Sequence, residues 1–341
     1  MFRALALALV LAGCSGAGGH TAWQVRSVTL DARNRPSADM LPALRAMGLT
    51  HITLVQFGFQ RDADVPVIRM QPDARWYSES DRGARELAAA ADSLGMGIIV
   101  KPHLWLGRYS TEGQSRSSIG YTSEAEWLEW ESQYQELIMH YALLAEEIKA
   151  YMLVVGTELA RSARERPQFW RALIGQVRQV YSGHLTYAAN WWDEYEHVTF
   201  WEDVDAIGIQ GYFELSDVPD PSLAELAGGW RKYKSDLKQL ATETGRPVLF
   251  TEIGYRNVPD AAAKPWRWPS RDEIGRVAPD DPLQARLYES FFENFREEPW
   301  FEGAILWKWT GDRDRRRNML DFSPQGKLAE DVIRRGFGGA P

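Results

Sequence analysis

The sequence has a single cysteine, Cys14, among its 341 residues. An internal disulfide bond needs two cysteines, so none can form within this chain. The sequence also lacks the paired histidine or cysteine spacing of a metal site, a glycine-rich phosphate loop and a dinucleotide-binding fingerprint. The Gly-x-Ser-x-Gly motif of serine hydrolases is absent as well. The sequence therefore implies neither a metal nor a cofactor.

The N-terminal apolar stretch, residues 4–12, is too short to span a bilayer as a stable helix. It follows a short basic start and ends in Leu-Ala-Gly-Cys-Ser, which resembles the cleavage site of bacterial lipoproteins. We expect a signal peptide at residues 1–13, a lipid on Cys14 and a flexible tether at residues 14–21. An ordinary signal peptide is the alternative. The expected location is the bacterial cell envelope, anchored by lipid to the outer membrane or the periplasmic face.

The chain also lacks an excess of positive charge. Its 39 Lys and Arg residues against 47 Asp and Glu residues give a net charge of −8, so no attraction to nucleic acid is expected. In contrast, tryptophan is abundant, with 15 residues, several-fold more than average composition would give. Flat indole rings suit stacking on the C–H faces of sugars. We expect a monomer whose partner is a β-linked oligo- or polysaccharide.

From residue 22 to residue 341, apolar runs alternate with amphipathic stretches, which is typical of βα units. The predicted strands are residues 24–30, 51–57, 97–103, 151–157, 185–190, 204–210, 247–252 and 303–308. The predicted helices are residues 37–47, 82–94, 123–149, 167–181, 230–244, 282–297 and 327–335. Eight strands can close a barrel, so the sequence predicts an α/β protein with one (β/α)₈ domain.

Two of the predicted strands end in a glutamate. Glu158 closes the run Tyr-Met-Leu-Val-Val-Gly-Thr-Glu-Leu, and Glu252 closes the run Pro-Val-Leu-Phe-Thr-Glu-Ile-Gly-Tyr. Catalytic groups of such barrels lie at the C-terminal ends of the strands. A pair of carboxylates facing each other there is the machinery of glycoside hydrolysis. Each glutamate taken singly also fits a solvated carboxylate at a strand end or a helix-capping acid.

These motifs resemble the clan of retaining (β/α)₈ glycosidases, and most closely glycoside hydrolase family 113, whose known members are β-mannanases. The resemblance covers the mature chain, including Ile-Leu-Trp-Lys-Trp on strand eight and Phe-Ser-Pro-Gln-Gly-Lys before the last helix. It implies that Glu158 is the general acid/base and Glu252 the nucleophile. Many clan members have asparagine before the acid/base, where it hydrogen-bonds the sugar 2-hydroxyl. This chain has Thr157 there, and the resemblance implies that Thr157 contacts the substrate.

Further candidates for substrate binding follow other predicted strands. They are His103 and Trp105 after strand three, Asn190, Trp191 and Trp192 after strand five, Gln210 and Tyr212 after strand six, and Trp307 and Trp309 on strand eight. His103 alternatively is a satisfied core histidine. We expect one of the adjacent indoles, Trp191 or Trp192, to line the groove and the other to pack. Alternation along a strand predicts that Trp307 and Trp309 share one face.

The Tyr212 hydroxyl is predicted either to orient the nucleophile by a hydrogen bond or to pack in the wall. The long segment after strand seven, residues 257–282, contains Lys-Pro-Trp-Arg-Trp-Pro. Loops of that length in compact domains are usually functional. We expect it to form part of the groove wall on the leaving-group side, and packing over a helix is the alternative.

Together these features predict a retaining glycoside hydrolase of β-1,4-linked hexose polysaccharides, an endo-β-1,4-mannanase by resemblance. One enzymatic alternative is a β-glucanase or cellulase-like member of the same clan. The other alternative is a carbohydrate-binding lipoprotein that has lost catalysis. Cleavage of mannan, glucomannan or cellulose to new reducing ends discriminates among the three.

Overall fold

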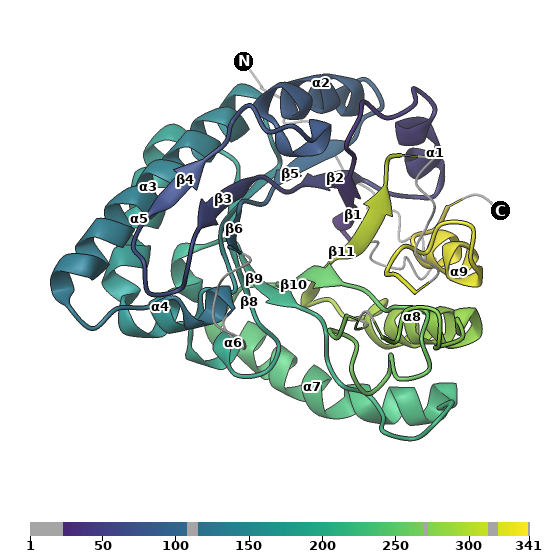
Figure 1. Ribbon diagram of the computed structural model, residues 1–341. Coiled ribbons are helices and arrows are strands. Elements are labelled where there is room, and N and C mark those ends of the chain that lie inside the picture. Colours follow the sequence, from purple (N-terminus) through teal and green to yellow (C-terminus); the bar gives the residue numbers. More distant parts are fainter. Residues whose placement is uncertain (1–22, 108–114, 269, 271, 313–319, 340–341) are drawn as a thin grey trace, which may run out of the picture.

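The structure is a computed structural model that describes residues 23–107, 115–268, 270, 272–312 and 320–339. The predicted signal peptide, tether and Cys14 lie outside these residues. Within them, eight parallel strands form a closed barrel in the order β1-β11-β10-β9-β8-β7-β5-β2 (Figure 1). The barrel strands are β1 (Val25–Asp31), β2 (His51–Leu54), β5 (Gly97–Val100), β7 (Met152–Thr157), β8 (His184–Ala189), β9 (Ala206–Gln210), β10 (Val248–Ile253) and β11 (Phe301–Thr310).

Helices surround this barrel on its outside (Figure 1). They are α1 (Met40–Ala46), α2 (Asp81–Asp92), α3 (Glu124–Glu147), α4 (Ala160–Glu165), α5 (Pro167–Val180), α6 (Glu194–His197), α7 (Leu223–Thr244), α8 (Asp281–Phe295) and α9 (Leu328–Gly336). Short 3₁₀ turns are η1 (Tyr77–Glu79), η2 (Arg116–Ser118) and η3 (Trp201–Asp203). The predicted (β/α)₈ fold is confirmed.

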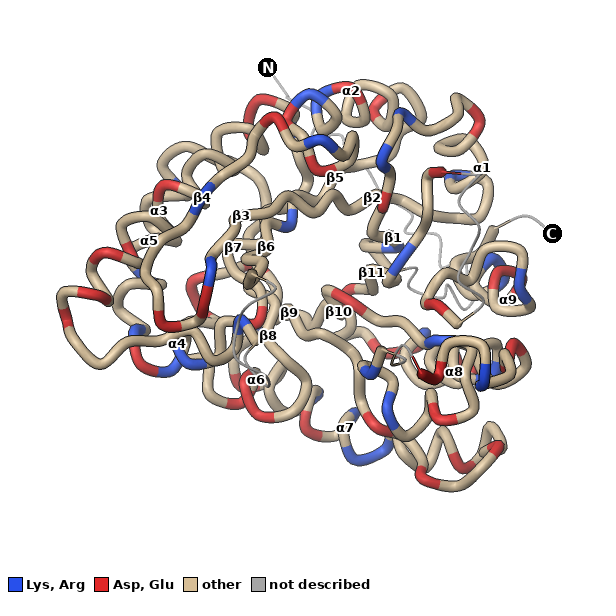
Figure 2. The backbone as a smooth tube through the Cα atoms, in the orientation of Figure 1, with Lys and Arg blue, Asp and Glu red and all other residues tan. Residues whose placement is uncertain are grey.

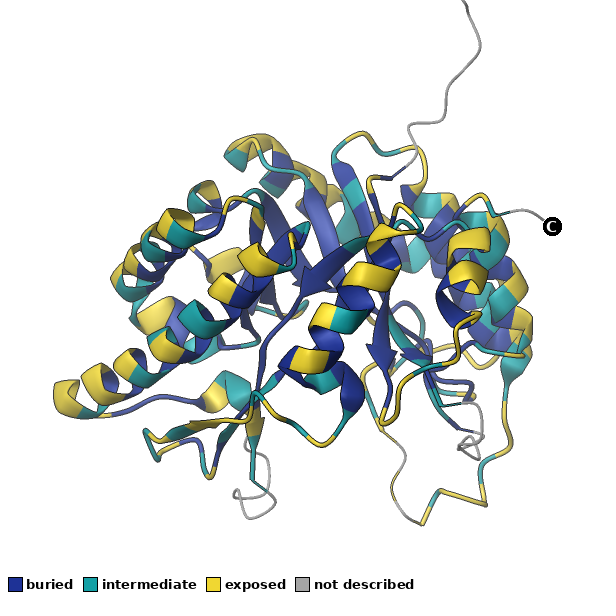
Figure 3. Ribbon diagram, turned by 90° about the horizontal axis from the view of Figure 1, so that it is seen from above, coloured by how far each residue is buried: buried dark blue, intermediate teal, exposed yellow. Residues whose placement is uncertain are grey.

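The hydrophobic core has two layers, because each barrel strand is covered on both faces. A small cluster fills the barrel interior: Val25, Ile99, Met152, Val154, Ala188, Ala206, Leu249 and Ile305. A much larger cluster lies between the strands and the helices. The strands are accordingly buried, and exposed residues lie on the outward faces of the helices (Figure 3).

Helix α3 confirms the sequence pattern most directly. Ser123 and Glu126 form a capping box at its start, with the Ser123 hydroxyl accepting from the Glu126 amide at 3.3 Å. Its aromatic and aliphatic stripe is buried in the core, from Trp127 to Leu144. This stripe therefore serves packing, as expected from its three- and four-residue spacing.

Helix α7 begins at Leu223, seven residues before the predicted start. Gly228 and Gly229 weaken the helical signal there, because glycine disfavours helix interiors. The real start is a capping box formed by Ser222 and Glu225. A side chain at Gly229 would bring its Cβ to 2.2 Å from the carbonyl oxygen of Leu215, so close packing requires glycine at this position.

Two predicted strands, 51–57 and 97–103, end earlier than expected because each splits into a barrel strand and a separate strand above it. A three-stranded sheet has the order β4 (Ile68–Met70), β3 (Phe57–Gln60) and β6 (His103–Leu106). Pro102, which has no amide hydrogen to donate, lies between β5 and β6. The side sheet brings Phe57, His103 and Trp105 to the C-terminal opening of the barrel.

Acidic and basic residues are interspersed around the outer helices rather than gathered by sign (Figure 2). In the part of the chain that the structure describes, no helix is both long enough and apolar enough to cross a membrane.

Candidate active site

The two glutamates lie at the C-terminal opening of the barrel. Glu158 directly follows β7, and Glu252 is the next-to-last residue of β10. Both strands shift register at this end, β7 before Thr157 and β10 before Glu252, and such bulges re-aim side chains near active sites. Glu158 also has φ of 54°, a left-handed conformation that non-glycine residues rarely adopt. Both side chains line one cavity of about 290 Å³, here called the smaller cavity.

Glu252 is held by two donors that come from other strands. The ammonium Nζ of Lys101 lies 2.5 Å from Glu252 Oε1, and the Tyr212 hydroxyl donates to Glu252 Oε2 at 2.8 Å. Lys101 is fully buried, and its Nζ also donates to the carbonyl oxygen of Thr251 at 2.9 Å. Burial lowers the pKa of Lys101, while the charge of Glu252 opposes that shift. A buried carboxylate therefore has a cation and a hydroxyl fixed against it.

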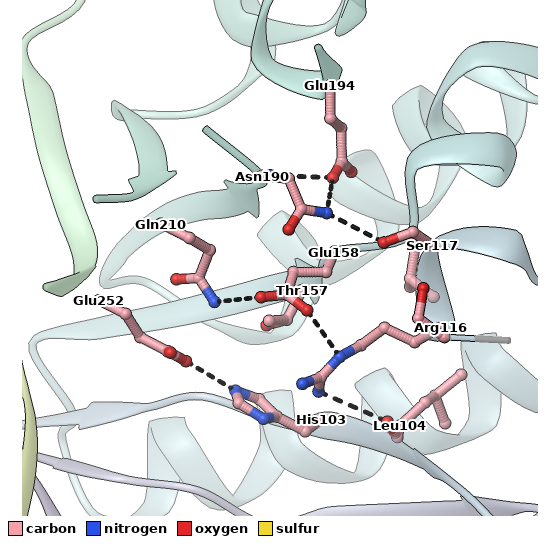
Figure 4. A network of polar contacts seen from close by, with 12 residues as sticks. His103, Leu104, Arg116, Ser117, Thr157, Glu158, Asn190, Glu194, Gln210 and Glu252 are labelled. Carbon is pink, nitrogen blue, oxygen red and sulfur yellow. Dashed lines mark hydrogen bonds and ion pairs between the residues drawn. The ribbon is translucent and has the colours of Figure 1, made fainter. Parts of the chain in front are cut away.

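Glu158 is held differently, by one residue from a connecting segment and one from the barrel. Arg116 Nε donates to Glu158 Oε2 at 3.0 Å, and Gln210 Nε2 donates to Glu158 Oε1 at 3.0 Å (Figure 4). The side-chain oxygen Oε1 of Gln210 accepts from Lys101 Nζ at 3.2 Å. Gln210 thus connects the surroundings of both glutamates. The Glu158 side chain is 18% exposed against 6% for Glu252, so Glu158 has greater access to solvent.

His103 lies beside Glu252, with Nε2 at 3.7 Å from Glu252 Oε1 (Figure 4). Burial lowers the pKa of His103 well below its ordinary value, and the charges of Arg116 and Lys101 lower it further. The imidazole is therefore neutral at pH 7. It stacks on Trp307 with ring centroids 6.3 Å apart and planes 9° apart. His103 is thus buried, as expected of a core histidine. It also lines the larger cavity, as expected of a substrate-binding residue.

Asn190 lies on the same side as Glu158. Its Nδ2 donates to Ser117 Oγ at 3.0 Å and to Glu194 Oε2 at 2.7 Å (Figure 4). Glu194 also accepts from the Tyr187 hydroxyl. Burial raises the pKa of Glu194 to about 7, although the hydrogen bonds from Tyr187 and Asn190 oppose that shift. A buried carboxyl group thus fixes the amide of Asn190 at the cavity wall.

A larger cavity of about 660 Å³ adjoins the smaller one and shares Arg116, Trp268 and Trp307 with it. Aromatic rings dominate its lining: Phe57, Phe59, Trp76, Trp105, Trp268 and Trp307. Its lining also includes Asp31, Glu79 and Lys308, and Lys308 forms an ion pair with Asp31. Burial, with the charge of Asp31, raises the pKa of Glu79 to about 7. Aromatic surface thus extends from the smaller cavity, which both glutamates line, into the larger one.

Trp105, Trp191 and Trp192 lie at the cavities. Trp105 is 54% exposed and lines the larger cavity, while Trp192 is 51% exposed and lines the smaller one. Trp191 lines the smaller cavity too, and it packs edge-on against Tyr212 with ring centroids 5.5 Å apart. The expectation that only one of the adjacent indoles faces the groove is therefore wrong. Both reach it because the chain turns after Ala189 and is no longer an alternating strand.

The prediction that Trp307 and Trp309 share a face is also wrong. Trp307 lines both cavities, whereas Trp309 is buried in the layer between strands and helices. Against β1, the strand advances three residues from Leu306 to Trp309 while β1 advances only two. This one-residue shift turns Trp309 to the opposite face of the barrel wall.

Thr157 is buried, and its hydroxyl lies 3.4 Å from the carbonyl oxygen of Pro102. Its role toward a sugar hydroxyl stays a prediction. The segment 257–282 contributes Trp266 and Trp268 to the smaller cavity, in agreement with a groove wall. Trp268 also packs on Phe322, with ring centroids 4.9 Å apart.

Sequence reasoning missed Lys101, Arg116 and Ser117. Lys101 carried a usable signal, since a lysine at the end of an apolar strand needs a buried acidic partner. Arg116 and Ser117 carried none, because they lie in a polar connecting segment that is distant from both glutamates in sequence. Only the fold brings them to Glu158 and Asn190.

Among the residues that the structure describes, no group of three His, Cys, Asp or Glu side chains is placed to hold a metal ion. Two carboxylates at the ends of barrel strands, next to aromatic cavities, define the class of glycosidases with a (β/α)₈ fold. The sequence profile of Glycoside Hydrolase Family 113 matches residues 21–327. The chain belongs to this glycoside hydrolase family.

Solved structures agree with this assignment. A family 113 β-mannanase from Alicyclobacillus acidocaldarius, solved in complex with ManMIm, is 26% identical, with a TM-score of 0.77 over 94% of this chain and 98% of that one. A family 113 β-1,4-mannanase complex is 24% identical, with a TM-score of 0.76 over 94% and 99%. A β-glucuronidase from Ruminococcus gnavus, 12% identical, shares the fold alone, with a TM-score of 0.60 over 92% and 50%. No curated protein sequence matches the chain.

Proposed function

We propose that this protein is a retaining endo-β-1,4-mannanase in which Glu158 is the general acid/base and Glu252 the nucleophile. The observation that carries the proposal is the shared cavity: both carboxylates line it, and Gln210 connects their surroundings. Glycoside hydrolysis needs two such groups on opposite sides of one bond. Aromatic rings line both the smaller cavity, which holds the two glutamates, and the adjoining larger cavity, and this extended surface supports cleavage within a chain.

In the proposed reaction, the Glu252 carboxylate attacks the anomeric carbon while Glu158 donates its proton to the leaving oxygen. A covalent glycosyl ester of Glu252 forms, and the leaving sugar departs as an alcohol. Glu158, now ionised, removes a proton from water, and the resulting hydroxide displaces Glu252 with a second inversion. Lys101 and Tyr212 fix the carboxylate of Glu252 before attack, which is the kind of preorganised electrostatic environment that lowers barriers.

Mannan is proposed as the substrate because the family 113 neighbour that is 26% identical is a β-mannanase. The test is incubation of the purified protein with mannan, glucomannan and cellulose, followed by measurement of reducing ends. Preferential cleavage of mannan into mixed oligosaccharides, with the β-anomer formed first in NMR spectra, is the expected result. Cleavage of cellulose alone would assign a β-glucanase, and binding without cleavage would overturn the catalytic proposal.

We also propose that Cys14 carries a lipid and that the enzyme is anchored in the bacterial cell envelope. The described chain starts at Trp23, just before β1, and so at the end of the barrel opposite the two glutamates. A tether leaving from that end would leave the cavities accessible to a polymer. Cys14→Ala should abolish labelling by a fatty-acid probe and release the protein from the membrane fraction, with unchanged activity. Membrane association of that variant equal to the wild type would refute anchoring through this residue.

A further inference from the structure

Three connecting segments meet beside the smaller cavity at one exposed carboxylate, that of Glu214. The indole Nε1 of Trp266 donates to Glu214 Oε1 at 3.0 Å, and the indole Nε1 of Trp191 donates to Glu214 Oε2 at 3.2 Å. Trp191 follows β8, Glu214 follows β9, and Trp266 lies between β10 and α8. A single side chain thus joins two tryptophans that are 75 residues apart in sequence, from 191 to 266.

The backbone of Glu214 is itself fixed, since its carbonyl oxygen accepts from the Tyr233 hydroxyl of α7 at 3.3 Å. Each oxygen of the carboxylate serves a different indole, so neither contact substitutes for the other. Hydrogen bonds to an ionised acceptor are stronger than bonds between neutral groups. The carboxylate therefore fixes the edges of both rings.

Both indoles line the smaller cavity beside Glu158 and Glu252, and Trp266 is 44% exposed. Because each N–H is bonded to Glu214, neither ring can donate to a sugar hydroxyl. What remains for a ligand is the apolar face of each ring. Such a face suits the C–H groups of a pyranose.

The position of these rings indicates which part of a substrate they meet. Both glutamates line the smaller cavity and neither lines the larger one. Trp191 follows β8, which pairs with β7, the strand that Glu158 follows, whereas His103, at 3.7 Å from Glu252, lines the larger cavity. The acid must lie next to the oxygen that leaves, so the leaving part of the chain extends from Glu158 along the smaller cavity. The larger cavity, beyond Trp307, is then left for the sugars on the other side of the scissile bond.

We propose that Glu214 is a specificity-determining residue that positions Trp191 and Trp266 as a platform for pyranose units on the leaving-group side. The inference rests on the proposed function for the direction of the substrate. Glu214 does not touch the reacting atoms. It acts through the two indoles, so it determines how strongly the enzyme prefers long leaving groups over short ones.

The test compares two substrates of the same enzyme. One is a mannohexaose that extends at least two sugars past the cleaved bond, and the other is a β-mannoside with an activated aryl leaving group. Glu214→Ala should lower the ratio of kcat/KM for the hexasaccharide to that for the aryl glycoside about tenfold, mainly through KM. Glu214→Gln, which keeps one acceptor oxygen, should lower the ratio about threefold. Trp266→Ala should also lower the ratio, and the double variant should lose less than the product of the two single losses, because Glu214 acts in part through Trp266.

The matched control is Glu298→Ala. Glu298 Oε2 accepts from the Trp300 indole at 2.6 Å, at the opposite end of the barrel, so its removal also breaks a carboxylate–indole contact. That variant should leave the substrate ratio unchanged. An equal loss on both substrates with Glu214→Ala would assign the residue to the alignment of Glu252 through Trp191 and Tyr212, and would overturn the platform. An unchanged ratio would overturn it as well.

The platform proposal can be tested separately from the proposed function. If the wild type cleaves another β-linked oligosaccharide instead of a mannoside, the same ratio is measured with that sugar. If it cleaves none, the catalytic proposal fails. The platform proposal is then tested by binding, measured as quenching of tryptophan fluorescence by mannohexaose and by mannobiose. Glu214→Ala should then weaken mannohexaose binding about tenfold more than mannobiose binding. Equal weakening of both would refute the platform.

Discussion

The site has two regions that hold their carboxylates in different ways. The floor, built from strands and their ends, consists of Lys101, Gln210, Tyr212, Thr251 and Glu252. The wall, built mainly from connecting segments, consists of Arg116, Ser117, Glu158, Asn190 and Glu194. The floor fixes Glu252 with a buried cation, whereas the wall leaves Glu158 three times more exposed, at 18% against 6%.

This difference matches the two tasks proposed for the glutamates. A nucleophile must be ionised and immobile, and a buried ammonium with a hydroxyl provides both conditions. An acid/base must exchange its proton with a leaving oxygen and then with water, so it needs access to solvent. Two carboxylates of the same chemistry thus acquire different properties from their surroundings.

The largest loss of activity is expected from substitution of Glu252 in the floor. Glu252→Ala should lower turnover on the order of 10⁴-fold on every substrate, because no covalent intermediate can form. Added azide should restore product as a glycosyl azide of the anomeric configuration opposite to the substrate, detected by NMR. A glycosyl azide with the configuration of the substrate would indicate that the two glutamates have the reverse roles.

In the wall, the loss of activity caused by substitution of Glu158 should depend on the leaving group. Glu158→Ala should lower the rate on polysaccharide about 10³-fold and on an activated aryl glycoside about tenfold or less, because a good leaving group needs little protonation. The measurement is the first chemical step for both substrates under pre-steady-state conditions. Equal losses would argue against an acid role and would remove the contrast between floor and wall.

The Lys101→Met variant tests whether the activity of Glu252 depends on the buried ammonium of the floor. Lys101→Met leaves the carboxylate of Glu252 buried without a counter-charge, and kcat/KM at neutral pH should fall on the order of 10²-fold.

The control for Lys101 is Lys234→Met, which breaks an ion pair with Glu298 at 2.7 Å outside the site. It should leave kcat/KM unchanged. A Lys101→Met enzyme with an unchanged kcat/KM and a lower melting temperature would show that the lysine serves stability alone.

The smallest effect concerns the stability of the wall. The pKa of Glu194 is raised to about 7 in the folded protein, so the folded state binds its proton more tightly than the unfolded state does. The free energy of unfolding should therefore fall as pH rises from about 4.5 to 7, by at most about 3 kcal/mol from this group. Glu194→Gln should reduce that dependence, measured by thermal unfolding between pH 5 and pH 8. An unchanged slope would show that Glu194 does not titrate in this range.

Much of the site could be predicted because it lies where an apolar run ends. Glu158, Glu252, Gln210 and Asn190 lie at or just after the ends of strands that are recognisable from composition, and the barrel brings such ends together. The partners of these residues were harder to predict. The register shift in β11 that buries Trp309 has no sequence signature, because it depends on how Leu306 and Trp309 pair with β1.

The sequence by itself determined the order of the eight barrel strands, the capping box of α3 and the strand ends that carry the two glutamates. These features depend on local periodicity and on backbone hydrogen bonding within a few residues. Only the tertiary structure decided that Lys101 lies beneath Glu252, that Arg116 reaches Glu158 and that Glu214 joins two tryptophans. Those contacts depend on the closure of the barrel, which places residues from distant segments within hydrogen-bonding distance of one another.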